Sequence, residues 1–420
     1  MREMKDSGIE WIGKVPVEWK IDNPQYHFSQ RKDRAKQGMV QLTASQKYGV
    51  ITQTEYMERT GANIVTVQKD FDILKLVCAG DFVIHMRSFQ GGLEYSEKTG
   101  SISSAYVMLI PSNTIREPRY YKWFFKSSNY IDALSSTSNL VRDGQAMRWS
   151  NFIQLPILFP PAEEQQRIAD FLDAKCAEID ALTADIQTQI DTLEQYKRSV
   201  ITETVTKGLD PDAEMKDSGI QWIGNMPVHW DVIRGKYILR YMQKPVREDD
   251  GVITCFRDGE VTLRSNRRED GFTMSDKEIG YQGIDVGDLV VHGMDGFAGS
   301  IGISDSRGKA SPVLNVLDTD QCKRYIMYYL RSMAYSDVFL ALATGIRVRS
   351  CDLRWNKLAE LSYPVPPLDE QNAIVKHIDS VLSKADAVIA DKKAQLATLD
   401  EYKKSLIFEY VTGKKEVPAP

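Results

Sequence analysis

The chain has 420 residues, of which 42% are hydrophobic and 26% charged, so its composition fits a folded protein of two or three domains and not a disordered one. The formal net charge of -5, taken as an average, argues against a surface coated with positive charge for nucleic acid. No apolar run approaches the ~18–20 residues of a membrane span, the N-terminal residues lack the apolar core of a signal peptide, and the five cysteines have no CxxC spacing. We therefore expect a cytoplasmic protein with no membrane segment, disulfide framework or metal site.

The N-terminal segment is the first half of an internal repeat. Residues 4–19 read MKDSGIEWIGKVPVEW and residues 215–230 read MKDSGIQWIGNMPVHW, with identity at 12 of 16 positions. Two further pairs match at an offset of 206: PPAEEQQ (160–166) with PPLDEQN (366–372), and LEQYKRSVITETVT (193–206) with LDEYKKSLIFEYVT (399–412). A period of about 200 residues indicates a duplicated domain, since solenoids repeat every ~20–50 residues. We therefore expect two pseudo-two-fold-related halves.

The middle of each half, residues 20–155 and 231–363, is predicted to be an α+β domain. Its apolar runs alternate with turn signals, and the strand–turn–strand pattern of ILKLVCAGDFVIH in the first half recurs as DVGDLVVHGM in the second. Each middle then has one aromatic-rich helical stretch, at residues 120–134 and 325–342. Such aromatic stripes favour a buried core over a platform for stacking bases.

A long helix is predicted after each middle. Pro160-Pro161 forbids helix immediately before it, acidic residues follow in the first turn, and no glycine or proline interrupts the pattern before Gly208. Apolar residues recur at the 3.5-residue spacing of a coiled-coil seam. The seam positions are Leu172, Ile179, Ile186, Leu193 and Val200 in the first helix, and Ile378, Ala385, Ile389, Leu399 and Leu406 in the second.

Two arrangements fit these helices: each packs on its own domain, or the two pair with each other. The narrow seam with polar flanks favours an antiparallel coiled coil. Lysines within the seam either set its register, face a partner or only extend their charge to water. The predicted spans are a first globular domain (1–155), helix one (156–209), a second globular domain (210–363), helix two (364–414) and a tail (415–420).

Catalytic patterns are absent from the sequence. It contains no GxxxxGK[ST] loop, no GxGxxG at a strand–helix junction, no HExxH and no GxSxG. The glycine-rich GFAGSIG (296–302) is expected to be a turn, and paired acids such as Glu163-Glu164 fit a helix start better than acid–base catalysis. We expect a chain that is not itself an enzyme.

Charge is distributed unevenly along the chain. Residues 20–155 carry 17 basic and 12 acidic residues, residues 156–214 carry 5 and 13, and residues 231–363 carry 19 of each. The acidity therefore belongs mainly to the first helix, and the middles keep basic clusters on polar loops, where a phosphate or base edge is best approached. Any one cluster also fits an ordinary solvated surface. The candidate DNA-contacting residues are Arg31, Lys32, Arg34, Lys36, Arg87, Arg142, Arg148, Arg264, Arg267, Arg268, Arg347, Arg349 and Arg354.

With its duplicated KDSGIxWIG start, its PPxxEQ helix starts and its YKxSxI helix ends, the chain resembles the specificity subunit of type I restriction–modification enzymes over its whole length. The resemblance implies two target recognition domains, within 1–155 and 210–363, that each read one half of an asymmetric, bipartite site in double-stranded DNA. It also implies that the long helices set the spacing and carry two methyltransferase subunits, which restriction (motor) subunits then join.

The resemblance assigns the chemistry to those partners. S-adenosylmethionine, ATP and Mg would be used by the partner subunits, and none would be bound by this chain. The near-neutral second domain departs from the expectation of strong phosphate contact, so the partners are expected to help hold the DNA. The alternative is a coiled-coil scaffold that binds only proteins. Neither the DNA sequence nor the base-contacting side chains can be read from a single sequence.

Overall fold

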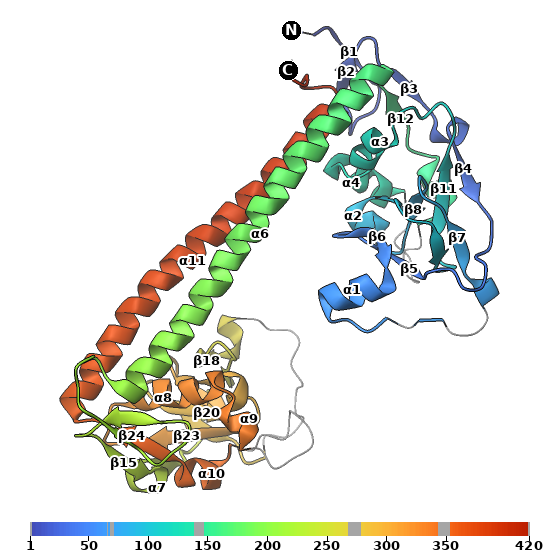
Figure 1. Cartoon of the computed structure of the whole chain (residues 1–420). Coiled ribbons are helices and arrows are strands. Elements are labelled where there is room, and N and C mark those ends of the chain that lie inside the picture. Colours follow the sequence, from blue (N-terminus) through green and yellow to red (C-terminus); the bar gives the residue numbers. More distant parts are fainter. Residues whose placement is uncertain are drawn as a thin grey trace. The chain divides into compact units, whose positions relative to one another are not determined.

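In the computed structural model the chain forms two compact units, and the structure describes residues 2–64, 66–67, 71–137, 147–267, 279–342 and 353–418 (Figure 1). The first unit is Met1–Ile186 with Ala394–Pro420, and the second is Gln187–Lys393. Each unit thus holds one globular domain and a part of both long helices, α6 (Ala162–Lys207) and α11 (Leu368–Val411). The spans predicted from the sequence treat each long helix as a separate segment, whereas each compact unit contains parts of both helices.

The first globular domain is built on an antiparallel four-stranded sheet of order β4-β11-β8-β9. Two-stranded ladders and short helices complete it. Its strands are β1 (Met4–Asp6), β2 (Lys14–Pro16), β3 (Lys20–Asp22), β4 (Phe28–Arg31), β5 (Leu42–Ser45), β6 (Gly49–Thr52), β7 (Lys75–Val77), β8 (Phe82–Ile84), β9 (Glu94–Tyr95), β10 (Gly100–Ile102), β11 (Val107–Pro111) and β12 (Ile157–Phe159). Its helices are α1 (Gln53–Thr60), α2 (Ser88–Gly91), α3 (Pro118–Phe124), α4 (Ser128–Ser136) and α5 (Trp149–Phe152).

The second globular domain repeats this topology, with a four-stranded sheet of order β16-β23-β20-β21. Its strands are β13 (Met215–Asp217), β14 (Asn225–Pro227), β15 (Asp231–Arg234), β16 (Arg240–Met242), β17 (Ile253–Cys255), β18 (Val261–Leu263), β19 (Gln282–Ile284), β20 (Leu289–His292), β21 (Ile301–Ile303), β22 (Gly308–Ala310), β23 (Leu314–Asp318) and β24 (Ser362–Val365). Its helices are α7 (Gly235–Ile238), α8 (Lys323–Tyr335), α9 (Val338–Ala341) and α10 (Trp355–Glu360). The duplication predicted from the repeat is therefore visible in the strand order.

Each aromatic-rich stretch forms two helices where one was predicted. In the first domain α3 begins at Pro118 after an N-cap by Glu117, whose side chain accepts from the Arg119 backbone N–H, and extended backbone at Ser127 separates α3 from α4. In the second domain Asp337 has a left-handed φ of 55° and separates α8 from α9. The aromatic side chains are core, as predicted: Tyr120 and Tyr325 are fully buried.

The PPxxEQ motif has a structural role at the start of each long helix. The buried Gln165 side chain donates through Nε2 to the Pro160 carbonyl at 2.8 Å, and Gln371 donates to the Pro366 carbonyl at 2.8 Å. Each glutamine thus satisfies a carbonyl that the prolines leave outside the helix. The preceding glutamate faces the repeated hairpin: Glu164 accepts from Trp19 Nε1 at 2.9 Å, and Glu370 pairs with His229 Nε2 at 2.8 Å.

The repeated N-terminal hairpins cover the C-terminal ends of the long helices. Gly208 and Gly413 follow α6 and α11 with φ of 78° and 68°, a conformation that glycine adopts without steric cost. A Cβ on Gly413 would lie 2.6 Å from Pro16 and 2.9 Å from Trp19, and one on Gly208 would lie 3.2 Å from Trp230. The KDSG…PVxW repeat is therefore a cap that packs over a helix end.

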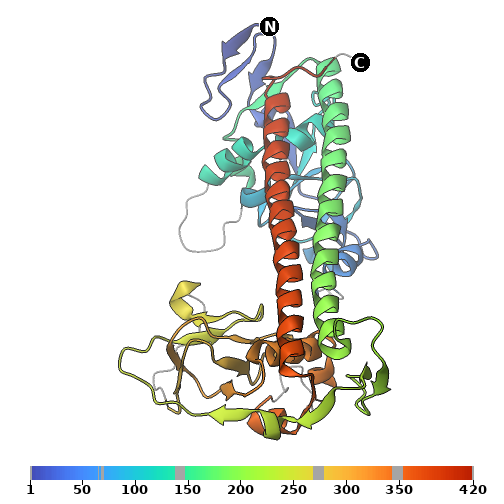
Figure 2. The ribbon, with the colours of Figure 1, turned by 90° about the vertical axis from the view of Figure 1, so that its left-hand side faces the viewer.

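The long helices run antiparallel, and within each unit their segments lie side by side (Figures 1 and 2). In the first unit Lys403 pairs with Asp180 at 2.5 Å, and in the second Lys197 pairs with Asp386 at 2.5 Å. The two pairs are equivalent, because Lys403 and Asp386 lie 206 positions after Lys197 and Asp180, and in both the seam lysine links one helix to the other. None of the described helices is long and apolar enough to cross a membrane.

The predicted seam residues line this contact to different degrees. Seven have buried side chains: Leu172, Ile179, Ile186, Ile378, Ala385, Ile389 and Leu406. Three are half-buried: Leu193, Val200 and Leu399. Near the helix ends the seam joins the domain cores, because Leu172 and Leu406 belong to the same apolar cluster as Tyr120 and Phe124. The helices therefore pair with each other and also pack on their domains.

Candidate nucleic-acid interface

Arg31 is held in a buried ion pair. Its Nε and Nη2 lie 2.7 Å and 2.9 Å from the two carboxylate oxygens of Asp81, whose side chain is 2% exposed and also accepts from the Cys78 backbone N–H at 2.8 Å. The hydrogen bonds with Asp81 raise the pKa of Arg31 above its ordinary value. A guanidinium in this bidentate pair has little left to offer a phosphate. Arg31 therefore supports the sheet between β4 and β8.

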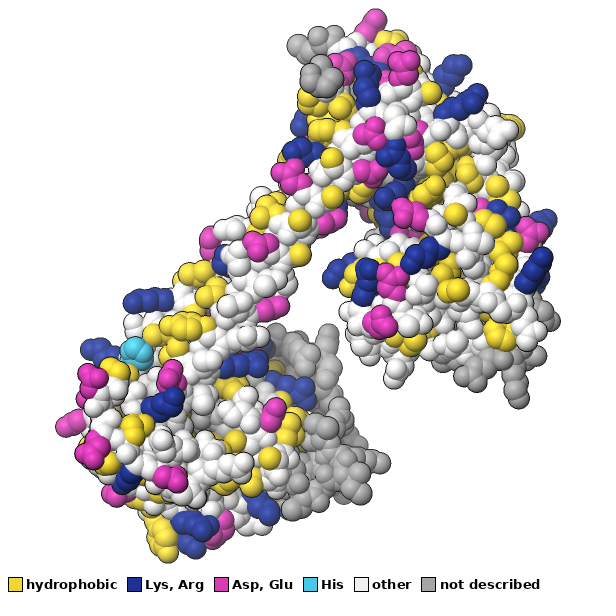
Figure 3. Space-filling view, in the orientation of Figure 1, with side chains coloured by type: hydrophobic (Ala, Val, Ile, Leu, Met, Phe, Trp, Pro, Cys, Tyr) yellow, Lys and Arg dark blue, Asp and Glu magenta, His cyan; other side chains and the backbone are white. Residues whose placement is uncertain are grey.

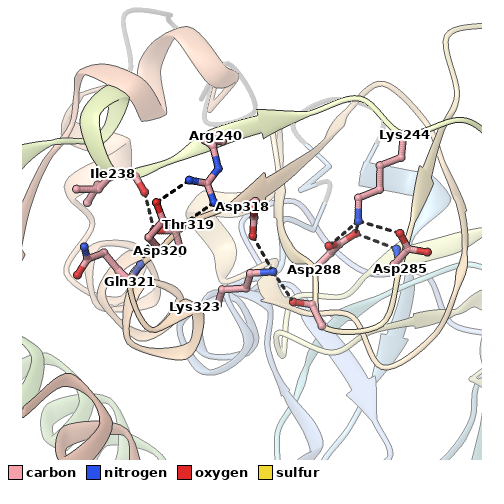
Figure 4. Close-up of polar contacts among 11 residues, drawn as sticks. Ile238, Arg240, Lys244, Asp285, Asp288, Asp318, Thr319, Asp320, Gln321 and Lys323 are labelled. Carbon is pink, nitrogen blue, oxygen red and sulfur yellow. Dashed lines mark hydrogen bonds and ion pairs between the residues drawn. The ribbon is translucent and has the colours of Figure 1, made fainter. Parts of the chain in front are cut away.

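The second domain places a larger network at the corresponding edge of its sheet (Figure 4). Lys244 pairs with Asp285 at 2.9 Å and with the buried Asp288 at 2.6 Å, while Arg240 pairs with Asp318 at 2.9 Å and Asp320 at 2.7 Å. Arg240 and Lys323 lower the pKa of Asp318 to about 2. The basic residues of this network are matched by carboxylates, which agrees with the balanced charge of residues 231–363.

Four candidates of the first domain remain available to a ligand. Lys32 and Lys36 lie in the loop between β4 and β5, Arg87 lies between β8 and α2, and Arg148 immediately precedes α5. Their side chains are exposed, and within the part of the chain that the structure describes none has an ion-pair partner. Arg34 is exposed but donates to the Ile73 carbonyl at 2.9 Å. On the face drawn in Figure 3, basic and acidic side chains are interspersed.

The candidates of the second domain are more constrained. Arg267 pairs with Asp258 at 2.7 Å and Glu260 at 3.2 Å, and its guanidinium lies 4.2 Å from the centre of the Phe256 ring. Arg264 is half-buried, with Nε 3.4 Å from Thr254 Oγ1. Arg354 is exposed. The remaining candidates, Arg142, Arg268, Arg347 and Arg349, lie outside the described residues.

Arg148 and Arg354 occupy equivalent places in the two domains. Each is the N-cap of a short helix, α5 or α10, and each follows a buried residue, Met147 or Leu353. Leu353 donates to the Gly293 carbonyl at 2.8 Å, and a Cβ on Gly293 would lie 3.9 Å from Arg354 Cγ. The structure thus places Arg354 beside the end of the central strand β20.

The turn after each central strand is held by a histidine that the sequence analysis missed. His292 Nδ1 accepts from the Met294 and Asp295 backbone N–H groups at 3.2 Å and 2.9 Å, and His85 Nδ1 lies 3.3 Å from the Arg87 backbone N. Burial lowers the pKa of His292, although the Asp295 charge opposes this. The signal was present in the sequence, because GDFVIH and GDLVVH end in these two histidines. In the first domain this turn carries Arg87.

A hollow of about 700 Å³ in the first unit is lined by seven basic and five acidic residues. Among its lining residues Lys98 and Arg59 pair with Glu55 at 2.8 Å and 2.5 Å, and Lys404 pairs with Asp400 at 2.7 Å. Lys122, Lys126 and Lys403 likewise pair with Asp173, Glu94 and Asp180, so six of the seven basic residues that line the hollow have a carboxylate partner. Among the described residues no group of three or more His, Cys, Asp or Glu side chains is arranged to hold a metal ion.

The two buried cysteines, Cys176 and Cys255, are poor nucleophiles. Burial raises the pKa of Cys176 and of Cys255 to about 12, so both thiols stay protonated at neutral pH. Cys78 and Cys322 are half-buried, and Cys351 lies outside the described residues. Cys176 lies in the apolar cluster that the first domain shares with the long helices, and Cys255 in a cluster of the second domain.

Comparisons with known proteins agree with the duplicated architecture. A family model described as the type I restriction modification DNA specificity domain matches residues 27–192. The type I restriction enzyme MjaVIII specificity subunit of Methanocaldococcus jannaschii is 22% identical over 422 residues, covering 96% of this chain and 94% of that protein. The type I restriction enzyme EcoBI specificity subunit of Escherichia coli is 22% identical over 332 residues, covering 71% and 67%.

The fold has a counterpart among solved structures. A chain from a study of complex assembly and conformational transition of the type I R-M system aligns with a TM-score of 0.67 at 14% identity, over 96% of this chain and 99% of that one. The likeness in fold extends over both domains and both long helices, and the sequence likeness to the MjaVIII subunit extends over nearly the full length of both proteins. The chain is therefore similar, over nearly its whole length, to the specificity subunits of type I restriction–modification enzymes.

Proposed function

We propose that this chain chooses the DNA site of a type I restriction–modification complex, with each globular domain acting as a recognition domain for one half of an asymmetric, bipartite sequence. The observation that carries the proposal is that the two domains share a strand order but differ in their candidate contacts. The first offers the unpaired cations Lys32, Lys36, Arg87 and Arg148, and the second has most of its described arginines in ion pairs. Different side chains on one scaffold read different base edges.

The long helices set the distance between the half-sites. A 46-residue helix is ~69 Å long at 1.5 Å per residue, which corresponds to ~20 base pairs at 3.4 Å each. Neither α6 nor α11 contains a glycine or proline, so each is a stiff element. Half-site spacing in other two-part DNA readers is likewise a property of the connector.

The helix pair also carries the partners. Two methyltransferase subunits bind it, because the repeat at an offset of 206 presents the same surface twice, and restriction (motor) subunits join that assembly. S-adenosylmethionine, ATP and Mg are used by those partners, in the cytoplasm where the cell's DNA lies. The acidic first helix, with 13 acidic residues over 156–214, suits protein contact better than DNA contact.

The test is to sequence methylated DNA from cells that express the partner subunits with and without this chain. We expect one asymmetric motif of two half-sites around an unread spacer, present only when the chain is expressed. Methylation that persists without the chain, or a continuous motif, contradicts the proposal. A gel shift of the assembled complex across a salt series checks direct DNA binding, because phosphate contacts weaken as salt rises.

A further inference from the structure

Both recognition domains carry the same short pattern at the start of their aromatic helix: arginine, tyrosine, two residues, then an aromatic side chain that can donate a hydrogen bond. In α3 the residues are Arg119, Tyr120 and Trp123, and in α8 they are Arg324, Tyr325 and Tyr328. The two sets lie 205 positions apart, close to the repeat offset. Each set contacts both long helices within its own unit.

The arginine and the second aromatic residue hold an aspartate near the start of a long helix. Asp173 on α6 accepts from Arg119 Nη1 at 3.1 Å and from Trp123 Nε1 at 2.8 Å. Asp379 on α11 accepts from Arg324 Nη2 at 2.6 Å and from the Tyr328 hydroxyl at 2.6 Å. The two aspartates are 206 residues apart, so the same contact is made twice with different aromatic donors. A carboxylate bonded to a cation and a second donor fixes direction as well as distance.

The tyrosine of the pattern holds the end of the other long helix. The Tyr120 hydroxyl donates to the Val411 carbonyl of α11 at 2.7 Å. The Tyr325 hydroxyl lies 3.1 Å from the Val205 carbonyl of α6 and 2.9 Å from the Pro364 carbonyl, and the two carbonyls share its proton. The Val411 and Val205 carbonyls belong to the last helical turn, where no intrahelical donor is available. Both tyrosines are fully buried, and burial raises their pKa values well above the ordinary value, so both hydroxyls remain donors.

We infer that these residues, here called the docking clamp, are positioning residues that fix the orientation of each recognition domain on the helix pair and so determine which spacer lengths the protein accepts. Much of the remaining contact is the shared apolar core around Tyr120 and Leu172, and apolar packing has no preferred direction. The repeated hairpins add the Trp19–Glu164 and His229–Glu370 bonds, which hold the start of each long helix. The clamp adds directed bonds to both helices at once. This inference rests on the proposed function, since spacer length matters only to a protein that reads two half-sites.

The test is made on the assembled complex of this chain with its methyltransferase subunits. Its substrates are DNA fragments that carry both half-sites at the native spacer or at spacers one or two base pairs shorter or longer. Trp123→Phe removes the donor and keeps an aromatic ring, whereas Trp123→Tyr restores a donor of the kind that Tyr328 provides. Tyr328→Phe and Tyr328→Trp repeat the comparison in the second domain. Glu178→Gln is the control, because Glu178 lies on α6 and its ion pair is with Lys175 on the same helix.

We expect the preference for the native spacer over the altered spacers to fall about tenfold in the phenylalanine variants, because each variant loses about one directed hydrogen bond. The half-site sequences should not change, and the tyrosine, tryptophan and control variants should keep the native preference. An unchanged spacer preference in both phenylalanine variants, with or without a uniform fall in rate, overturns the inference. Failure of the unmodified complex to methylate a bipartite site would instead refute the proposed function. Thermal melting of each variant shows that the comparison is made between folded proteins.

Discussion

At the residue scale, position in the fold decides what a basic side chain does. Arg31 and Lys32 are neighbours in one RKDRAK run, but Arg31 forms an ion pair with the buried Asp81, whereas Lys32 is exposed. The sequence could not separate them, because the partner of Arg31 lies 50 residues away, in the turn before β8. Arg31 is the last residue of β4 and Lys32 is the first residue of the loop that follows, so only Arg31 is held at the sheet beside Asp81.

This difference predicts contrasting phenotypes for two alanine variants, Asp81→Ala and Lys32→Ala. Asp81→Ala should lower the free energy of unfolding by about 3 kcal/mol, because it leaves the Arg31 charge without its buried partner. Lys32→Ala should leave stability within about 0.5 kcal/mol and weaken DNA binding by the assembled complex, with a shallower salt dependence. Urea denaturation and a binding series across salt concentrations measure the two effects. Equal stability of both variants would contradict the assignment of Arg31 to the fold.

The half-buried His292 predicts a pH dependence of the second unit. Burial lowers its pKa in the folded state, so below the ordinary value of 6.5 the unfolded chain takes up a proton that the folded chain resists. The stabilisation that comes from keeping His292 neutral is therefore complete above pH 6.5. It is lost as the pH falls from there through the lowered pKa of His292 in the folded state. Two charged groups belong to this network. The Asp295 carboxylate lies 4.0 Å from His292, and the Arg257 guanidinium lies 3.0 Å from that carboxylate.

The variant His292→Asn keeps an acceptor for the turn and removes the titration. Thermal melting between pH 7.5 and 5.5 should show a smaller loss of melting temperature in this variant than in the unmodified chain. Parallel curves for the two proteins would mean that His292 does not titrate in this way. His85→Asn, at the equivalent position of the first domain, gives the matched comparison.

At the element scale, the repeated motifs are the parts that hold the fold together. PPxxEQ starts the long helices through Gln165 and Gln371, YKxS supplies the lysines that join them, and the N-terminal hairpin covers their ends. Each of these contacts is made once per unit with the same residue types. The segments that match best between the halves therefore build the scaffold, and the divergent middles are left to carry recognition.

A pair of glycine variants tests the helix-end cap. Gly413→Ala places a Cβ within 2.6 Å of Pro16 in addition to forcing a left-handed φ, and should cost about 3 kcal/mol. Gly8→Ala has a similar φ of 70° but nothing within 4 Å, and should cost only about 1 kcal/mol. Denaturant unfolding of both variants gives the comparison. Equal losses would show that the hairpin does not press on the helix end.

Sequence reasoning reached the elements that have a strong period and missed those that depend on distant partners. The helices α6 and α11 were predicted because a stripe of apolar residues persists over more than 40 residues without a breaker. The breaks at Ser127 and Asp337 were missed, since neither residue is a strong breaker and the apolar pattern continues across both. The docking clamp was missed because its partners, Asp173 and Val411, are distant in the sequence and lie on two other elements.

At the scale of the whole molecule, the net charge of -5 misleads until it is divided among the segments. The acid lies mainly on the first long helix, the first recognition domain keeps unpaired cations, and the second domain matches most of its described cations with carboxylates. A chain of this kind is suited to choosing a DNA site while partner subunits contribute to holding it. In the proposed function, the long helices set the distance between the two half-sites.

Lengthening both helices together tests their spacing role. Four residues inserted after Ile186 and four after Lys393, where the two compact units divide, preserve the seam and ion pairs on either side. Each helix grows by ~6 Å, so the methylated motif should gain about two base pairs of spacer with both half-sites unchanged. The control insertion after Asp212, in the exposed turn between Gly208 and β13, should leave the spacer as it was. An unaltered spacer in the double insertion would refute the role of the helices.

The central claim, that each domain reads one half-site independently, is tested most directly by exchanging the first recognition domain. The exchanged segment should run from residue 20 to residue 159, because β3 pairs with β12 and both strands must come from the same domain. Sequencing of methylated DNA from cells with the partner subunits should then show one new half-site, with the other half-site and the spacer retained. A change in both half-sites, or in neither, would contradict the account.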